Sequence, residues 1–262
     1  MISPFRLTKW YCDCVSENGE TVIGYHAALA WKSLSLSYAS YLTDRVPIER
    51  PSRTSLLRDG PPQITDNYSI QWQSDTLACS GEWHPRFSFT LPPQRLFEDD
   101  TGSIRWQCHH PLAEARVRVG ASEVVGLGYV ELLEMTIPPW RLSIDELHWG
   151  RFLSESTYLV WIEWRGSNPL SLAFFNGVRI AGAQVSDTTI TWQGGRLELN
   201  DRCVLRSGAL SQTVLAKIPG AARIFPKSIL DTDECKWRSR GTLSYEGTTH
   251  TGWAIHEVVV QG

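Results

Sequence analysis

The chain has 262 residues, of which 42% are hydrophobic and 20% charged, a composition that excludes disordered, collagen-like and coiled-coil proteins. Twenty-five basic and 28 acidic side chains give a net charge of −3, so no strong positive field attracts nucleic acid or an anionic membrane. The 12 Trp, 8 Tyr and 8 Phe are a heavy aromatic content, which suits either a packed core or the walls of an apolar pocket.

Short alternating runs of apolar and polar residues, broken by Gly, Pro, Asn and Asp, follow one another along the chain and predict an all-β fold. Asn176-Gly177 between two apolar runs predicts a hairpin, and a second hairpin is expected near residues 193–195. So many short strands favour a sandwich or a barrel. The other predicted strands are residues 9–15, 21–31, 34–42, 69–73, 76–83, 86–91, 103–108, 113–119, 123–135, 157–165, 202–207, 236–246 and 251–260.

Two breaks in this pattern organise the chain. Residues 44–66 are rich in Arg, Pro and Asp and predict a long loop or lid. After the segment at 108–111 a new series of strands begins, so we expect an N-terminal β domain at 1–112 and a C-terminal one at 113–262.

The six cysteines form no CxxC pair, and the N-terminus lacks the features of a signal peptide, so a cytoplasmic protein with free thiols is expected. No run approaches the roughly 18 apolar residues of a membrane-spanning helix. The expected partner is a hydrophobic small molecule rather than nucleic acid, and a homodimer through a sheet edge is left open.

Glutamates occur in two strands that are apolar on both faces. Glu163 lies in residues 158–164, and Glu131 shares a face with Tyr129 in residues 128–135. Burial disfavours the ionised form of a carboxylate and raises its pKa, which would make a proton donor near neutral pH. The alternative is that each glutamate lies at a strand end or pairs with an arginine.

The segment GLGYVELLEMTIPPWRLSIDELHWGRF (126–152), followed by YLVWIEW, resembles the lipocalin-like superfamily that contains hydroxyneurosporene synthase (carotenoid 1,2-hydratase) and fungal lipocalin-like Diels–Alderases. Residues 9–31 resemble the opening strands of the first domain of this family. The resemblance implies two consecutive calycin-type β-barrel domains with an apolar site at or near their junction.

Family members carry an acidic residue and a His shortly before a Trp-Gly pair, which here is Trp149-Gly150. This alignment places Glu146 at the position of the acid and Leu147 at that of the His, so His148 is displaced by one residue. In a strand, one residue turns a side chain to the opposite face. Residues 145–150 are nevertheless the best candidate cluster.

The function implied is a cofactor-free enzyme that hydrates, cyclises or isomerises a polyene, terpenoid or polyketide-like molecule. Glu146 or Glu131 would donate a proton and His148 would assist its transfer. Substrate-binding roles are expected for aromatic residues whose rings can stabilise a developing cation: Tyr129, Trp140, Trp149, Trp161 and Trp164.

Three alternatives stay open. A pericyclic enzyme needs only a shaped cavity, and a carrier would bind a lipid or pigment without transforming it. Arg141 and Arg151 could neutralise Asp145 and Glu146, which would depress the pKa of these carboxyls and argue against proton donation.

Other motifs give little support to other chemistry. A metal site at Cys108, His109 and His110 lacks identifiable further ligands. His26 and His256 lie in apolar runs and are expected to be core histidines. Neither the GxSxG motif of a serine hydrolase nor a Gly-rich phosphate or dinucleotide loop is present in the sequence.

Overall fold

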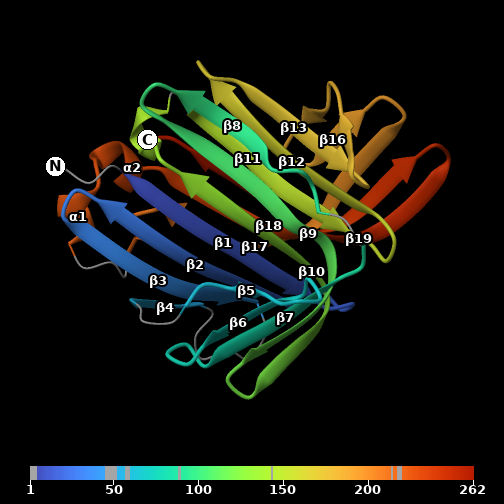
Figure 1. The fold of residues 1–262 in the computed structure, drawn as a ribbon. Coiled ribbons are helices and arrows are strands. Elements are labelled where there is room, and N and C mark those ends of the chain that lie inside the picture. Colours follow the sequence, from blue (N-terminus) through green and yellow to red (C-terminus); the bar gives the residue numbers. More distant parts are fainter. Residues whose placement is uncertain are drawn as a thin grey trace. The chain divides into compact units, whose positions relative to one another are not determined.

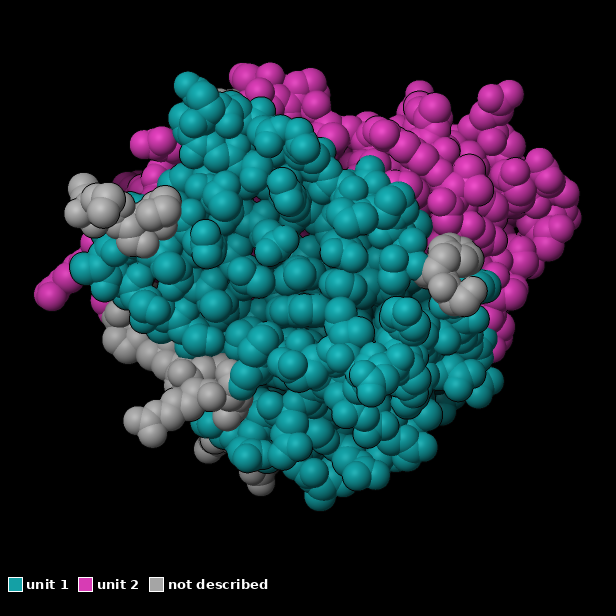
Figure 2. Space-filling view, viewed as in Figure 1, with its two compact units in different colours: residues 1–138 teal, residues 139–262 magenta. Residues whose placement is uncertain are grey.

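A computed structural model describes residues 5–44, 52–56, 60–87, 90–142, 144–213, 215–216 and 220–262 (Figure 1). The chain divides into two compact units, residues 1–138 and 139–262, which Figure 2 colours separately. Each unit is built around one antiparallel β-sheet, so the expected all-β fold is confirmed.

Unit 1 contains a ten-stranded sheet in the order β4-β3-β2-β1-β10-β9-β7-β6-β5, with β8 paired to β9. The first three strands lie side by side in Figure 1, where they are blue. Its strands are β1 (Arg6–Val15), β2 (Thr21–Trp31), β3 (Leu34–Thr43), β4 (Ser52–Leu56), β5 (Gln63–Ile64), β6 (Ile70–Ser74), β7 (Cys79–Pro85), β8 (Gln94–Asp99), β9 (Gly102–Val119) and β10 (Ser122–Met135).

Unit 2 contains a nine-stranded sheet in the order β14-β13-β12-β11-β19-β18-β17-β16-β15. A short 3-10 helix, η1 (Pro139–Arg141), precedes the sheet in the sequence. Two short helices, α1 (Ala221–Ile224) and α2 (Lys227–Leu230), lie in the segment that connects the strand ending at residue 209 to the strand that begins at residue 233. Its strands are β11 (Ile144–Leu153), β12 (Tyr158–Gly166), β13 (Leu170–Phe175), β14 (Val178–Ile180), β15 (Gln184–Val185), β16 (Thr189–Trp192), β17 (Gly195–Ala209), β18 (Asp233–Tyr245) and β19 (Thr248–Val260). Among the described residues, no helix has the length and apolar character needed to cross a membrane.

The two units share one topology. The order of β1–β4, β10, β9 and β7–β5 in the first sheet is the order of β11–β14, β19, β18 and β17–β15 in the second. The strands β1 and β11 each have ten residues and pair on both sides in the same way. Two consecutive lipocalin-like units, as the sequence predicted, therefore have matching frameworks.

Alternation along the strands gives each sheet one face that packs into a hydrophobic core. In unit 1, Trp10, Cys12 and Cys14 of β1 point into a core that also contains Trp72 and Trp83. In unit 2, Phe152 of β11 and Trp161 of β12 belong to the corresponding core, with Leu159, Ala173, Ala183, Val185, Ile190, Leu197, Leu199, Leu243 and Ala254. The face of β11 that carries Phe152 also carries His148, so the core side of unit 2 positions the candidate site.

The predicted hairpin at Asn176-Gly177 is confirmed between β13 and β14, because both residues have positive φ, 46° and 86°. The stretch 44–66 is not wholly a loop, since it contains β4 and β5. Its residues 45–51 and 57–59 lie outside the described part of the chain.

The units divide between Pro138 and Pro139, whereas the sequence placed the boundary near residue 112. Position 112 falls inside β9, which continues through Pro111. The pairing of β9 with β10 skips there, from Ala113 opposite Gly128 to His110 opposite Val130. A proline, which has no N–H to donate, is tolerated in a strand at such an irregularity, so the segment bends without ending the strand.

Candidate functional site

The candidate site of unit 2 begins with a pair on β11. Glu146 and His148 are two residues apart on one strand and therefore lie on the same face. His148 Nε2 lies 2.6 Å from Glu146 Oε1, and the His148 side chain is only 3% exposed. The displaced His148 thus contacts the acidic residue directly.

Arg165 of β12 completes a charged network around this pair. Its Nη1 lies 3.3 Å from Glu146 Oε2, and its Nε donates to Glu163 Oε1 at 2.8 Å. Its Nη2 donates to the carbonyl oxygen of Val185 at 2.8 Å. Because Arg165 stands opposite Glu146 and Glu163 opposite His148 in the β11–β12 ladder, the register itself assembles the network.

The environment of Glu146 differs from the one expected for a proton donor. Burial acts to raise the pKa of its carboxyl, but hydrogen bonds and charges from His148 and Arg165 outweigh it and hold the pKa below its ordinary value. An ionised Glu146 accepts hydrogen bonds and cannot donate a proton at neutral pH. The neutralising arginine is Arg165, whereas Arg151 is buried and donates to the carbonyl oxygen of Trp253.

Two further groups surround His148. Asp187, in the turn between β15 and β16, places its Oδ1 4.0 Å from His148 Nδ1. His256 of β19 lies on the same face, where it hydrogen-bonds Ser239 Oγ at 2.8 Å and stacks on Trp237 at 5.2 Å between ring centroids. Burial lowers the pKa of His256 to about 3, so it is a neutral core histidine, as expected.

A surface depression of about 560 Å³ lies beside the charged network. Glu163 and Arg165 line it together with residues 169–171 and 183–185. Arg165 and Ser171 also bond the backbone of residues 185 and 183 across it. The depression therefore provides an open approach to the network that holds Glu146.

The predicted aromatic residues of unit 2 fall into three places. Trp161 is on the core face and packs against Gly150. A Cβ atom added to Gly150 would lie 2.1 Å from the Trp161 ring. Trp149 and Trp164 are buried on the opposite face, and the Lys236 ammonium lies 5.1 Å from the centroid of the Trp149 ring. Trp140 of η1 contacts Phe225 edge to face. Only Trp161 therefore shares the face of His148.

The predicted residues of unit 1 form a separate network on β10. Glu131 Oε2 accepts hydrogen bonds from Trp106 Nε1 at 2.5 Å and from the Tyr129 hydroxyl at 2.7 Å. Burial, together with the charges of Cys108 and Glu131, raises the pKa of Tyr129, so it stays a neutral donor. Tyr129 and Glu131 thus contact each other, as their shared face predicted.

Sequence reasoning missed four polar residues of these networks. Tyr11 and Asp13 of β1 stand opposite Glu131 and Tyr129 in the ladder, and the Tyr11 hydroxyl donates to the fully buried Asp13 at 2.8 Å. Arg165 and Asp187 are the other two. The alternation of β1 could have put Tyr11 and Asp13 on one face, but nothing in the sequence near Asp187 points to His148.

The candidate metal residues do not assemble a site. Among the described residues there is no group of three or more His, Cys, Asp or Glu side chains that could hold a metal ion. Cys108 is buried, and its pKa is raised by burial. Burial also lowers the pKa of His109 to about 4, while the Trp10 ring stacks on it at 5.0 Å.

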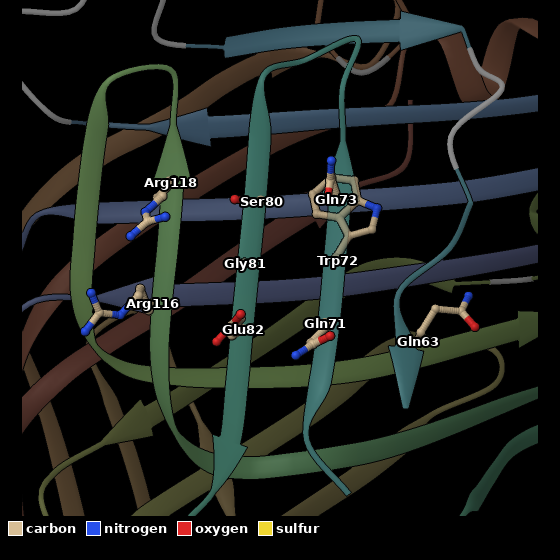
Figure 3. Close-up of a pocket in the computed structure, with 9 residues that line it drawn as sticks. All are labelled: Gln63, Gln71, Trp72, Gln73, Ser80, Gly81, Glu82, Arg116 and Arg118. Atoms are coloured by element: carbon tan, nitrogen blue, oxygen red, sulfur yellow. The ribbon is translucent and has the colours of Figure 1, made fainter. Parts of the chain in front are cut away.

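A second depression, of about 550 Å³, lies on unit 1 and is polar (Figure 3). Gln71 and Gln73 of β6, Glu82 of β7 and Arg116 and Arg118 of β9 contribute side chains to it. Both arginines also bind Glu123, which offsets part of their charge. Trp72 also lines this depression, but the charged side chains around it match a hydrophobic substrate poorly.

No protein-family model and no curated protein sequence matches the chain. Solved structures do resemble it over nearly its whole length. A Nitrosomonas europaea protein named as an AttH candidate superposes with a TM-score of 0.56 at 10% identity, covering 97% of this chain and 92% of that one.

Two other solved structures are similar. CghA gives a TM-score of 0.54 at 10% identity over 99% of this chain and 89% of its own. Kievitone hydratase from Nectria haematococca gives 0.52 at 8% identity over 97% and 88%. The chain therefore shares the two-unit fold of these solved structures.

Proposed function

We propose that the chain is a cofactor-free enzyme that transfers a proton on a hydrophobic polyene, terpenoid or polyketide-like molecule, with His148 as its base. The observation that carries this proposal is the 2.6 Å contact between His148 Nε2 and Glu146 Oε1. A carboxylate that accepts from one ring nitrogen orients the imidazole and stabilises the imidazolium formed when the other nitrogen takes a proton.

The other candidate residues take supporting roles in this proposal. Glu146 positions His148, and His148 and Arg165 together hold the pKa of the Glu146 carboxyl below its ordinary value. Trp161, on the same face as His148, is buried in the hydrophobic core and supports the site by packing. Glu131 is occupied by Trp106 and Tyr129, which suits a positioning role better than proton donation.

The similarity to kievitone hydratase supports a lyase or isomerase type of chemistry, because addition of water to a double bond requires a proton transfer. The comparison concerns the fold, and the same fold also serves binding. The chemical proposal therefore depends on the residues around His148.

Mass analysis of small molecules that copurify with the protein tests this proposal against a carrier role. The purified protein is incubated with its extracted ligand, and the products are compared with those of the His148→Gln variant. Conversion by the wild-type protein and not by the variant supports the enzyme. Recovery of an unchanged hydrophobic ligand from both would make the chain a carrier.

A further inference from the structure

The hydrogen bond to Glu146 fixes the chemistry of the two His148 nitrogens. A carboxylate can only accept, so Nε2 carries the hydrogen in this contact. In the neutral ring Nδ1 then has a free lone pair, and it is Nδ1 that faces Asp187 Oδ1 at 4.0 Å. Two hydrogen-bond acceptors therefore face each other across a gap too wide for a direct hydrogen bond.

The width of this gap suits one molecule with two donors. Two hydrogen bonds of about 2.8 Å that meet at the water angle of about 105° span about 4.4 Å. This value is close to the 4.0 Å between Nδ1 and Oδ1. A water held there donates one hydrogen to each acceptor and keeps its lone pairs free.

Hydrogen bonds between Ser186 and Thr189 fix the turn that carries Asp187. In its turn, Ser186 N donates to Thr189 O at 2.8 Å, and Thr189 N donates to Ser186 Oγ at 3.0 Å. The other charged and titratable groups near His148 are Glu146 on its own strand, Glu163 and Arg165 on β12 and His256 on β19. Arg165 is bound to Glu146, Glu163 and Val185, which leaves Asp187 and His148 facing each other.

We propose that His148 Nδ1 and Asp187 Oδ1 bind the water that the enzyme adds to an alkene conjugated with a carbonyl group. This inference rests on the proposed function and names its second substrate and the class of its first. Asp187 is a residue of the water site, and Nδ1 is the atom of His148 that takes the proton.

The step balances without any other reactant. The water oxygen bonds to the β-carbon as one of its hydrogens moves to His148 Nδ1, and the alkene electron pair shifts to the carbonyl oxygen to give an enolate. The imidazolium then returns this proton to the α-carbon, which restores the carbonyl and the neutral base. The sum is one water added across one double bond.

The ionised state of Glu146 also selects the class of alkene. An isolated double bond must first be protonated, and the ionised Glu146 cannot supply that proton. A conjugated carbonyl accepts the electron pair instead, so a base alone is sufficient. The substrate class is therefore a polyketide-like enone rather than a polyene hydrocarbon.

A high-resolution crystal structure tests the water site directly. The proposal predicts an ordered water within hydrogen-bond distance of His148 Nδ1 and Asp187 Oδ1, and its loss in Asp187→Leu with the Glu146–His148 bond kept. Asp187 is 62% exposed, so the substitution leaves the fold intact. The exposed Asp233→Leu is the matched control, which keeps the water. A direct Asp187–His148 bond, or a gap without ordered water, would overturn the site.

Product analysis in water labelled with oxygen-18 tests the reaction. Benzylideneacetone should gain one labelled hydroxyl, and phenylbutene, which lacks the carbonyl, should not react. Asp187→Leu should lower the addition rate about a hundredfold, because the water loses its orientation, while Asp233→Leu leaves it unchanged. Equal rates for Asp187→Leu and wild type, or hydration of phenylbutene, would contradict the proposal.

Hydrogen exchange separates failure of this inference from failure of the proposed function. In deuterium oxide, the wild-type protein should exchange the α-hydrogens of benzylacetone, and the His148→Gln variant should not. Exchange that depends on His148 without any oxygen-18 addition to benzylideneacetone would leave proton transfer standing and remove the water site. Absence of both activities in the wild-type protein would contradict both proposals.

Discussion

The state of the Glu146 carboxyl depends on His148 of its own strand and on Arg165 of the neighbouring strand. The Arg165 guanidinium forms ion pairs with both Glu146 and Glu163. It also donates a hydrogen bond to the carbonyl oxygen of Val185. Desolvation of Glu146 alone would have raised its pKa, as buried carboxylates in apolar strands predict. His148 and Arg165 reverse that direction, so the Glu146 carboxyl is held in its ionised form.

Replacing Arg165 by Met should therefore raise the pKa of Glu146 towards its ordinary value. The charge and the hydrogen bond of the guanidinium are lost, while burial remains. Titration of the Glu146 carboxyl carbon by NMR measures this change. Arg196→Met, which removes an exposed arginine paired with Glu198, is the control and should leave the titration unchanged. A Glu146 titration that is identical in all three proteins would refute this role of Arg165.

Close approach of three strands around Gly150 shapes the interior of unit 2. A Cβ at this position would lie 2.1 Å from the Trp161 ring and 2.8 Å from the Cβ of His256. Only glycine lets β11 pass between these side chains without displacing them. The Trp-Gly pair of the sequence thus has a packing reason.

Gly150→Ala should destabilise the protein by about 1–3 kcal/mol, because the core must shift to admit the methyl group. Urea unfolding measures the loss. Gly60→Ala is the matched control, since nothing lies within 4 Å of a Cβ there. Equal unfolding midpoints for the two variants would show that the interior accommodates the methyl group without cost.

The alternation of apolar and polar residues made most strands predictable, but it did not predict the irregular pairing between strands. Apolar–polar periodicity located most strands, and Asn176-Gly177 specified a turn that needs positive φ. The break at residues 108–111 suggested a domain boundary, yet β9 continues through Pro111 at an irregularity of its pairing with β10. Such an irregularity depends on the partner strand, which local sequence does not reveal.

The site was predictable to the extent that its residues share a strand. Glu146 and His148 are neighbours in sequence and in space, and so are Tyr129 and Glu131. Asp187 reaches His148 only because β15 and β16 form the far edge of the sheet that contains β11. Contacts of this kind require the sheet to curl, so that the segment at 183–187 lies near β11, β12 and β13, and the sequence alone did not identify them.

At the scale of the whole chain, the two units share a topology but carry different residues at equivalent positions. Because β1 and β11 are equal in length and similarly paired, Thr8 and Trp10 occupy the positions of Glu146 and His148. Neither of these side chains is a base. The framework is thus repeated, while the Glu146–His148 pair belongs to unit 2.

Acidification should destabilise the folded chain through its buried histidines. The pKa is about 4 for His109 and about 3 for His256, both lowered chiefly by burial from the ordinary value of 6.5. Between the folded-state and the ordinary pKa of each histidine, the unfolded chain binds more protons than the folded chain. The free energy of unfolding is therefore highest above about pH 6.5. It decreases as the pH falls, by about 1.4 kcal/mol per pH unit for each of the two groups.

Urea unfolding at about pH 7 and about pH 5 measures this dependence. His109→Phe and His256→Phe should each reduce the loss of stability, because each removes one group that the unfolded state protonates. His250→Gln, on β19 but less buried, is the control and should retain the wild-type dependence. A stability that does not change between the two pH values would contradict the burial of these neutral rings.

The most direct test of the account compares the turnover of the converted ligand by wild-type protein, His148→Gln and His250→Gln. Loss of a general base typically lowers the rate by about 10² to 10⁴. The account predicts a loss of this size for His148→Gln and an unchanged rate for His250→Gln. Equal turnover by all three proteins would show that the base lies elsewhere, or that the reaction needs none.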